Sequence, residues 1–384
     1  MGRSATAAQI GGLWAPVRTD DMRPSAKAEV PAARPKLEAL WRCPRCRGAL
    51  AHRSEGLDCV VCGHVYDQVD GIPDLRIPGP CWIDIEEDLA TAREIAAWDL
   101  PVEELVHAVY ARRSTWDDSL VRLRTAQVLT APQRLHKDVR GWLAEAVSHD
   151  AWLDLGCGPG MLLAAAAGLK APGRGVGVDV SMTWLVVAKR LITAHGGVPV
   201  LAAGLAEALP LADGALSGVV SLDVIEHIDS PDAFLVEIDR VVRPGGRLAL
   251  STPNRFSLSP EPHVMVWGVG LLPRRYQAGF VAWRSGKSYI STCLMSSGEL
   301  RRKLKRCTRF ACRILIPPVP DEEVGRFSPV KARLARLYNR VAAAPALRTV
   351  FLTIGPFFQI VGVKAGGHAA KPVIDREKRV LTGV

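Results

Sequence analysis

No stretch of this sequence is long and apolar enough to cross a bilayer, which takes about 20 residues of helix. The longest candidate, residues 350–363, is too short and is interrupted by Pro356. The N-terminal residues also lack the apolar core of a secretory signal peptide. A cytoplasmic protein is therefore the default expectation.

Acidic residues are scarce in the C-terminal part of the chain. From Leu271 onward there are 22 Lys and Arg against 6 Asp and Glu, whereas the whole chain has a net charge of only +10. A solvated basic surface explains this bias as well as a surface for phosphate, nucleic acid or anionic lipid does. Peripheral contact of basic C-terminal helices with a membrane is thus one open alternative.

The nine cysteines are too unevenly placed for a disulfide framework. Four of them form two Cys-x-x-Cys pairs separated by twelve residues, namely Cys43, Cys46, Cys59 and Cys62. Two such pairs supply four thiolates for tetrahedral zinc, and a module this small needs a metal to fold. Because all four ligands are cysteines, no coordination position is open, and we predict a structural zinc.

The residues around these cysteines form a longer pattern. It comprises Cys43-Pro44-x-Cys46-x-Gly48-x-Leu50, Cys59-x-x-Cys62-Gly63-x-x-Tyr66 and Asp70-Gly71-Ile72-Pro73-Asp74-Leu75. The pattern resembles the small zinc-ribbon activator family of methyltransferases. Members of that family occur as subunits of tRNA, rRNA and protein methyltransferases, and also fused in front of bacterial methyltransferase domains.

A glycine turn joins a predicted buried strand, Ala151–Leu155, to an apolar helix, Met161–Leu169. Its glycines let the backbone approach a ligand closely, and the open amides at the helix start can donate to polar ligand groups. The next strand, Gly175–Asp179, ends in an acid. An acid at that position reaches the ribose hydroxyls of an adenosine cofactor.

Strands and helices alternate from residue 151 to residue 254, which predicts a parallel sheet. Further strands are expected at 218–222, 247–251, 311–316 and 357–363, with helices at 182–195, 231–241, 297–306 and 329–342. We therefore predict an α/β fold. It has a seven-stranded Rossmann-like sheet with helices on both faces, and a small N-terminal zinc ribbon.

Five segments in this region together resemble the class I S-adenosylmethionine-dependent methyltransferases, and among them the ubiquinone-pathway O-methyltransferases. They are LDLGCGPG (153–160), GVDVS (177–181), AEALPLADG (206–214), SLDVIEHI (221–228) and RVVRPGGRLALSTPN (240–254). The resemblance implies that S-adenosylmethionine binds here. Its implied contacts are Asp154, Gly156, Gly158 and Gly160 for the methionine end, Asp179 for the ribose, Ala206 for the adenine and Leu222 for the sulfonium.

One departure from this family concerns Leu205, which stands where an acid usually accepts from the adenine amino group. Without that acid, either cofactor affinity is lower or Glu207 takes its place.

Methyl transfer to a hydroxyl benefits from a base, and His227, just after the strand at 218–222, is the candidate, with Asp223 beside it. A histidine that only packs against the next helix is the alternative. His263 is a second candidate base. Asp223, Glu226 and His227 also resemble a segment that is associated with a divalent metal in the ubiquinone-pathway group, so Mg²⁺ or a similar ion is a further expectation.

The expected domain organisation has five parts. Residues 1–38 form a disordered tail, 39–80 the zinc ribbon, 81–149 a helical connector or cap, 150–366 the methyltransferase domain and 367–384 a second tail. Within the connector, helices are expected at 84–97, 101–110, 117–129 and 132–147. The aromatic-rich insertion 256–296 is predicted to form a lid on the substrate side.

These patterns predict methyl transfer from S-adenosylmethionine to a small-molecule or lipid-like acceptor, at oxygen. An rRNA or tRNA base methyltransferase is the first alternative. The zinc ribbon and the basic C-terminal part favour it, but Ser221-Leu222-Asp223-Val224 does not match the Asn/Asp-Pro-Pro-Tyr motif of enzymes that act on base amines. A degenerate cofactor-binding module without catalysis is the second alternative, and only Leu205 favours it.

Overall fold

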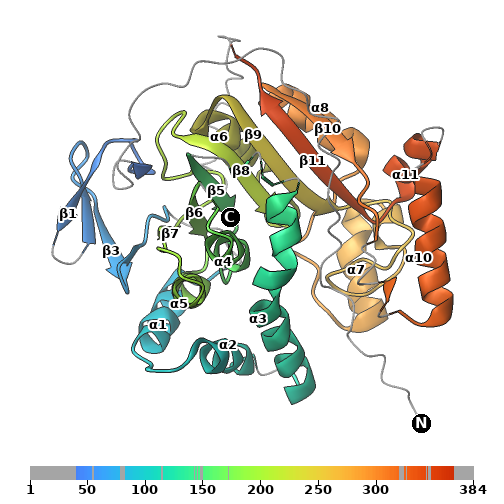
Figure 1. The fold of residues 1–384 in the computed structure, drawn as a ribbon, viewed down its shortest axis with the longest axis horizontal. Helices are drawn as coiled ribbons and strands as arrows, with labels where there is room; N and C mark the ends of the chain where they lie inside the picture. Colours follow the sequence, from blue (N-terminus) through green and yellow to red (C-terminus); the bar gives the residue numbers. More distant parts are fainter. Residues whose placement is uncertain are drawn as a thin grey trace.

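The computed structural model describes residues 40–366 except 54–55, 78–82, 114–115, 142, 145, 148–149, 172, 320–323, 326, 343 and 345–346. The tails predicted for residues 1–38 and 367–384 lie outside this part. Within it, a four-stranded sheet and a seven-stranded sheet are accompanied by helices (Figure 1).

The four-stranded sheet is an antiparallel ribbon that carries the four cysteines. Its strands are β1 (Leu50–Arg53), β2 (Gly56–Cys59), β3 (Val65–Val69) and β4 (Ile72–Pro73). The ribbon is attached by its two ends to β7 and to the segment that follows β7. The amide of Leu75 donates to the carbonyl of Ala203 at 2.8 Å, and the amide of Arg42 donates to the carbonyl of Pro210 at 2.9 Å.

The seven-stranded sheet has the order β10-β11-β9-β8-β5-β6-β7 and confirms the predicted fold class. β5, β6, β7, β8 and β9 are parallel, whereas β11 runs antiparallel to β9 and β10. Their bounds are β5 Ala151–Leu155, β6 Arg174–Asp179, β7 Leu201–Ala203, β8 Leu216–Leu222, β9 Val242–Pro253, β10 Phe310–Leu315 and β11 Phe357–Lys364.

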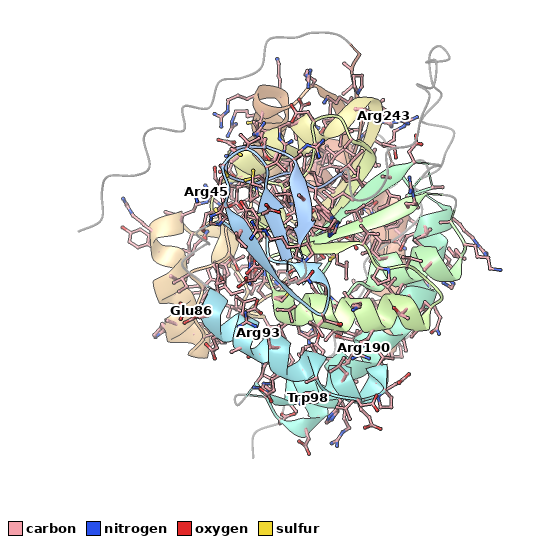
Figure 2. The ribbon with its side chains drawn as sticks, turned by 90° about the vertical axis from the view of Figure 1, so that its left-hand side faces the viewer. Arg45, Glu86, Arg93, Trp98, Arg190 and Arg243 are labelled. Atoms are coloured by element: carbon pink, nitrogen blue, oxygen red, sulfur yellow. The ribbon has the colours of Figure 1, made fainter. Side chains whose placement is uncertain are left out.

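Successive residues of a strand point to opposite faces of the sheet, and on each face they pack into a separate hydrophobic core. In β5, Trp152 joins one core and Leu153 joins the other. The first core contains α1 (Ile85–Ala96), α2 (Val102–Ala111), α3 (Asp118–Arg140), α4 (Met161–Gly168) and α5 (Met182–Ala194). The second contains α6 (Pro231–Val241), α8 (Ser297–Cys307) and most of the ribbon, which Figure 2 shows from outside with Arg45 labelled. Two residues of the ribbon, Val69 and Ile72, join the first core.

The prediction of two helices at 117–129 and 132–147 is wrong, because α3 runs through Pro132 without a break. A proline inside a helix removes one backbone donor and crowds the preceding turn. In the turn before Pro132, the Arg134 guanidinium donates to the carbonyl of Gln127 at 2.9 Å. The inward contacts of Val128 and Ala131 with the core also favour the continuous helix.

The insertion 256–296 contains a short 3-10 turn, η4 (Val269–Leu271), and the helix α7 (Arg274–Ser285). Two more helices, α10 (Pro329–Ala342) and α11 (Arg348–Ile354), lie between β10 and β11 in the sequence. In the part of the chain that the structure describes, no helix combines the length and apolarity that a membrane span requires.

Candidate functional site

The turn after β5 is built from glycines whose backbone angle φ is positive, at Gly156, Gly158 and Gly160. A Cβ on Gly156 would lie 2.4 Å from a methyl group of Val224, so this glycine allows the loops after β5 and β8 to touch. A Cβ on Gly158 would meet no atom within 4 Å, so the backbone there faces open space. The turn therefore leaves a surface of bare backbone that a ligand can approach.

Asp179 lies at the carboxyl end of β6, next to this turn. One carboxylate oxygen accepts from the amide of Gly158 at 2.8 Å, and the other accepts from the amide of Ser181 at 2.9 Å. The strand order reverses between β5 and β8, which is where ligands bind in open parallel sheets. The geometry thus brings together the glycine turn and the acid that the sequence singled out for the cofactor.

Burial affects the pKa of both acids at this edge. It raises the pKa of Asp154 to about 8, with a further contribution from the charge of Asp179. Burial also raises the pKa of Asp179, although the amides of Ser181 and Gly158 act in the opposite direction. Two acids whose charges oppose each other's ionisation favour a cationic ligand, which stabilises their charged forms.

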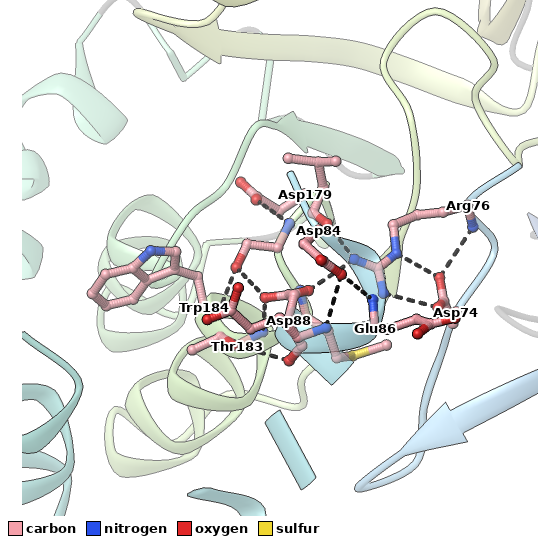
Figure 3. Close-up of polar contacts among 12 residues, drawn as sticks. Asp74, Arg76, Asp84, Glu86, Asp88, Asp179, Thr183 and Trp184 are labelled. Carbon is pink, nitrogen blue, oxygen red and sulfur yellow. Dashed lines mark hydrogen bonds and ion pairs between the residues drawn. The ribbon is translucent and has the colours of Figure 1, made fainter. Parts of the chain in front are cut away.

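The loop after Asp179 is held by an ion-pair network that the sequence did not reveal (Figure 3). The Arg76 guanidinium is fully buried and binds Asp74 at 2.7 Å and Asp88 at 2.8 Å. It also donates to the carbonyl of Val180 at 2.9 Å. Asp88 on α1 in turn accepts from the amide of Met182 at 2.7 Å, at the start of α5. The end of the ribbon and α1 therefore fix the loop that carries Asp179.

The predicted adenine-side residues follow β7. The amide of Gly204 donates to the carbonyl of Asp179 at 2.9 Å, which places the turn containing Leu205 and Ala206 beside Asp179. The carboxylate of Glu207 accepts from the amide of Ser230 at 3.4 Å and so is directed toward the start of α6. Leu222, the predicted sulfonium-side residue, is half-buried at the end of β8.

Asp223 and His227 follow β8. Asp223 has a positive φ of 55° and accepts from the Ser251 hydroxyl at 2.8 Å. His227 ends the 3-10 turn η3 (Ile225–His227), and its Nδ1 lies 3.1 Å from the carbonyl oxygen of Ser291 in the insertion. Since a carbonyl only accepts, Nδ1 carries the proton and Nε2 keeps its lone pair.

The insertion brings His263 against His227, with ring centroids 4.7 Å apart. Its Nδ1 lies 2.5 Å from a carboxylate oxygen of Glu261, and its Nε2 lies 3.9 Å from Oε1 of Glu226. Oε1 of Glu226 is buried and has no hydrogen-bond partner among the described residues, whereas Oε2 accepts from Thr252. The insertion thus contributes side chains to the edge of the sheet where the glycine turn lies.

Donor atoms of Glu226, His227 and His263 lie within 4.8 Å of one another. The metal-ligand set predicted from the sequence was Asp223, Glu226 and His227. In the structure, His263 rather than Asp223 groups with Glu226 and His227. Burial raises the pKa of Glu226 well above its usual value, and the charge of Asp223 adds to this effect. Burial, and then His263, lowers the pKa of His227, which keeps its ring neutral near pH 7.

The four cysteines of the ribbon form a second cluster whose sulfur atoms also lie within 4.8 Å of one another. The Sγ atoms of Cys43 and Cys62 are 3.7 Å apart, and those of Cys46 and Cys59 are 3.4 Å apart. These separations are close to those of thiolates around a tetrahedral ion with metal–sulfur bonds of about 2.3 Å. The donor set therefore fits zinc.

Comparison with known proteins agrees with this geometry. The "Methyltransferase domain" family matches residues 153–250. An uncharacterized 37.1 kDa protein from transposon TN4556 of Streptomyces fradiae is 36% identical over 244 residues, which cover 60% of this chain and 66% of that protein. A ubiquinone biosynthesis O-methyltransferase of Mesorhizobium japonicum is 39% identical over 104 residues, or 27% of this chain and 41% of that enzyme.

Among solved structures, a chain in the complex of the Haloferax volcanii Trm112 methyltransferase activator with a methyltransferase has a TM-score of 0.42. The match has 19% identity and covers 62% of this chain and 92% of that chain. This chain spans less than two thirds of the length of either curated relative above.

The parallel sheet, the glycine turn and the family match over residues 153–250 make this part of the chain a class I S-adenosylmethionine-dependent methyltransferase domain. It is preceded by a ribbon with a four-cysteine site. Within the class, the Mesorhizobium relative shows that the similarity extends to the ubiquinone-pathway O-methyltransferases.

Proposed function

We propose that the protein transfers a methyl group from S-adenosylmethionine to a small-molecule or lipid-like acceptor, at oxygen. The observation that supports this most directly is the arrangement of two sets of groups at one edge of the sheet. The glycine turn and Asp179 supply the cofactor side, and the histidines of η3 and the insertion supply the acceptor side. An insertion folded over this edge suits an enclosed acceptor better than an exposed nucleic acid.

The proposed cofactor contacts are those predicted from the sequence. Asp179 would hold the ribose hydroxyls, and Asp154 with the glycine turn would hold the methionine end, where a buried acid complements an ammonium group. The sulfonium already activates the methyl group, so the protein must align the acceptor and exclude water.

The histidines are placed to take the proton of an acceptor hydroxyl. In His227, the hydrogen bond to Ser291 fixes the proton on Nδ1, and the lowered pKa keeps Nε2 free to accept. In His263, the hydrogen bond to Glu261 orients the ring in the same way. A carboxylate that holds an imidazole in one tautomer is a recurrent arrangement for a general base.

The cluster of Glu226, His227 and His263 also fits a divalent metal. Oε1 of Glu226 is a buried oxygen without a partner among the described residues, and two imidazoles lie beside it. A carboxylate with two imidazoles suits zinc, manganese or iron better than magnesium, which prefers oxygen ligands. When bound, such an ion would acidify an acceptor hydroxyl.

Substitution Asp179→Ala is expected to weaken S-adenosylmethionine binding by about 100-fold or more, because hydrogen bonds to a charged group contribute about 1.5–3 kcal/mol each. Calorimetric titration of the zinc-replete protein measures this. Asp150→Ala, which removes an acid at the opposite end of β5, is the control and should bind like the wild type. Equal binding by Asp179→Ala would contradict the assigned cofactor site.

Substitution His263→Ala is expected to lower methyl transfer by at least about 100-fold, the usual contribution of a general base, without changing cofactor affinity. Acceptor screening with phenols, quinones, sugars and RNA identifies a substrate for this assay.

The same variant tests the metal site. Equilibrium dialysis with Mn²⁺ should show one metal equivalent beyond the ribbon site in the wild type and none in the variant. His107→Ala, on the exposed side of α2, is the control.

The same acceptor screen distinguishes this proposal from the two alternative functions. RNA binding that falls steeply with salt, together with methylation of RNA, would favour an RNA methyltransferase. Cofactor binding without turnover on any acceptor would favour a degenerate module.

A further inference from the structure

Helix α10 exposes an apolar stripe to solvent. Val330, Leu334 and Leu337 follow the helical spacing i, i+4, i+7, and they are 73%, 60% and 54% exposed. The opposite side of α10 carries Ala332 and Ala335, which are buried in a small core. An amphipathic helix normally turns its apolar stripe toward the protein, and here the large apolar side chains point away from it.

Cations line this stripe. Arg333, Arg336 and Arg340 recur along one flank at helical spacing, and α10 contains no acidic residue. The structure shows no hydrogen bond or ion pair for these three arginines within the described part of the chain. On the other flank, Lys331 lies over the ring of Phe327 at 4.2 Å.

Helix α11 lies beside α10 and also exposes apolar side chains. The rings of Tyr338 and Phe351 pack edge to face at 5.4 Å, which joins α10 to α11. Around α11, Leu347 and Val350 are also exposed. Figure 1 shows both helices on the outside of the molecule, at the side of the sheet away from the ribbon.

We propose that this face of α10 and α11 docks on the surface of an anionic lipid membrane. Exposed aliphatic side chains flanked by arginines match the boundary between acyl chains and negatively charged headgroups. A second copy of the chain fits poorly, because two such faces would bring arginines together without an acid. A nucleic acid fits poorly as well, because the stripe is aliphatic and offers no aromatic platform for bases.

The proposal does not depend on the identity of the methyl acceptor, and a failure of catalysis would leave it unchanged. It is tested by co-sedimentation of the full chain with vesicles of phosphatidylcholine that contain phosphatidylglycerol, against vesicles of phosphatidylcholine alone. We expect binding to the anionic vesicles, and at least tenfold weaker binding to the neutral ones.

Two variants probe the two components of the face. Leu334→Ser with Leu337→Ser removes apolar contact, and Arg333→Gln with Arg336→Gln and Arg340→Gln removes charge. Each is expected to weaken binding to anionic vesicles at least tenfold. Because these side chains are exposed, circular dichroism should show unchanged folding.

The matched control neutralises a basic helix without an exposed apolar stripe, through Arg301→Gln, Arg302→Gln and Lys305→Gln on α8. This variant should bind vesicles nearly as well as the wild type. An equal loss in the α8 variant would overturn the proposal, since it would show that binding follows total charge. Absence of vesicle binding would also overturn it, as would concentration-dependent dimers that the leucine variant abolishes.

Discussion

Removal of metal from the four-cysteine site is expected to release one zinc ion per chain and to unfold the ribbon of β1–β4. Structural zinc contributes about 10–16 kcal/mol of apparent binding free energy in small modules, which is also folding free energy. The ribbon shares a core with Leu211 and Val242 of the large domain, so its loss also destabilises that domain. If the unfolding free energy of the large domain falls by roughly 5 kcal/mol, its thermal midpoint falls by about 10–20 °C.

Metal analysis and thermal denaturation followed by circular dichroism measure this effect in the double variant Cys43→Ser, Cys59→Ser. Cys293→Ser is the matched control, because Cys293 is exposed and lies outside the cluster. The control should keep its zinc and its midpoint. A double variant that keeps the wild-type midpoint would show that the ribbon folds without metal.

Substitution Arg76→Met is expected to cost about 3–5 kcal/mol of unfolding free energy, the usual cost of leaving a buried charge without its partner. The substitution leaves the largely buried carboxylates of Asp74 and Asp88 without their cationic partner. It also removes the hydrogen bond to the carbonyl of Val180. Chemical denaturation at pH 7 measures the loss. Because the network holds the loop after Asp179, S-adenosylmethionine affinity should fall as well.

Arg112→Met is the control for this experiment. Arg112 makes an equally short ion pair, 2.8 Å from Glu94, but both side chains are largely exposed. Exposed ion pairs contribute little to stability, so the control should denature like the wild type. If Arg76→Met and Arg112→Met behave alike, the buried network does not support the cofactor loop.

Most strands and helices between residues 151 and 254 could be predicted because each is a short apolar segment bounded by glycine, proline or an acid. The strand β7 is an exception, because its three residues are too few to show a pattern. The four-cysteine cluster was equally predictable, since its ligands lie close in the sequence. The contact of Asp88 with Ser181 spans 93 residues and has no local pattern. The grouping of His263 with Glu226 and His227 could not be predicted for a similar reason, because it depends on the path of the insertion through space.

The ribbon covers β7, the three-residue strand at one margin of the seven-stranded sheet. Its pairing with Ala203 through Leu75 occupies hydrogen-bonding groups that an edge strand would otherwise present to other chains. A ribbon that has lost its metal would leave that margin open. Loss of the metal would thus expose this margin of the sheet to pairing with strands of other chains.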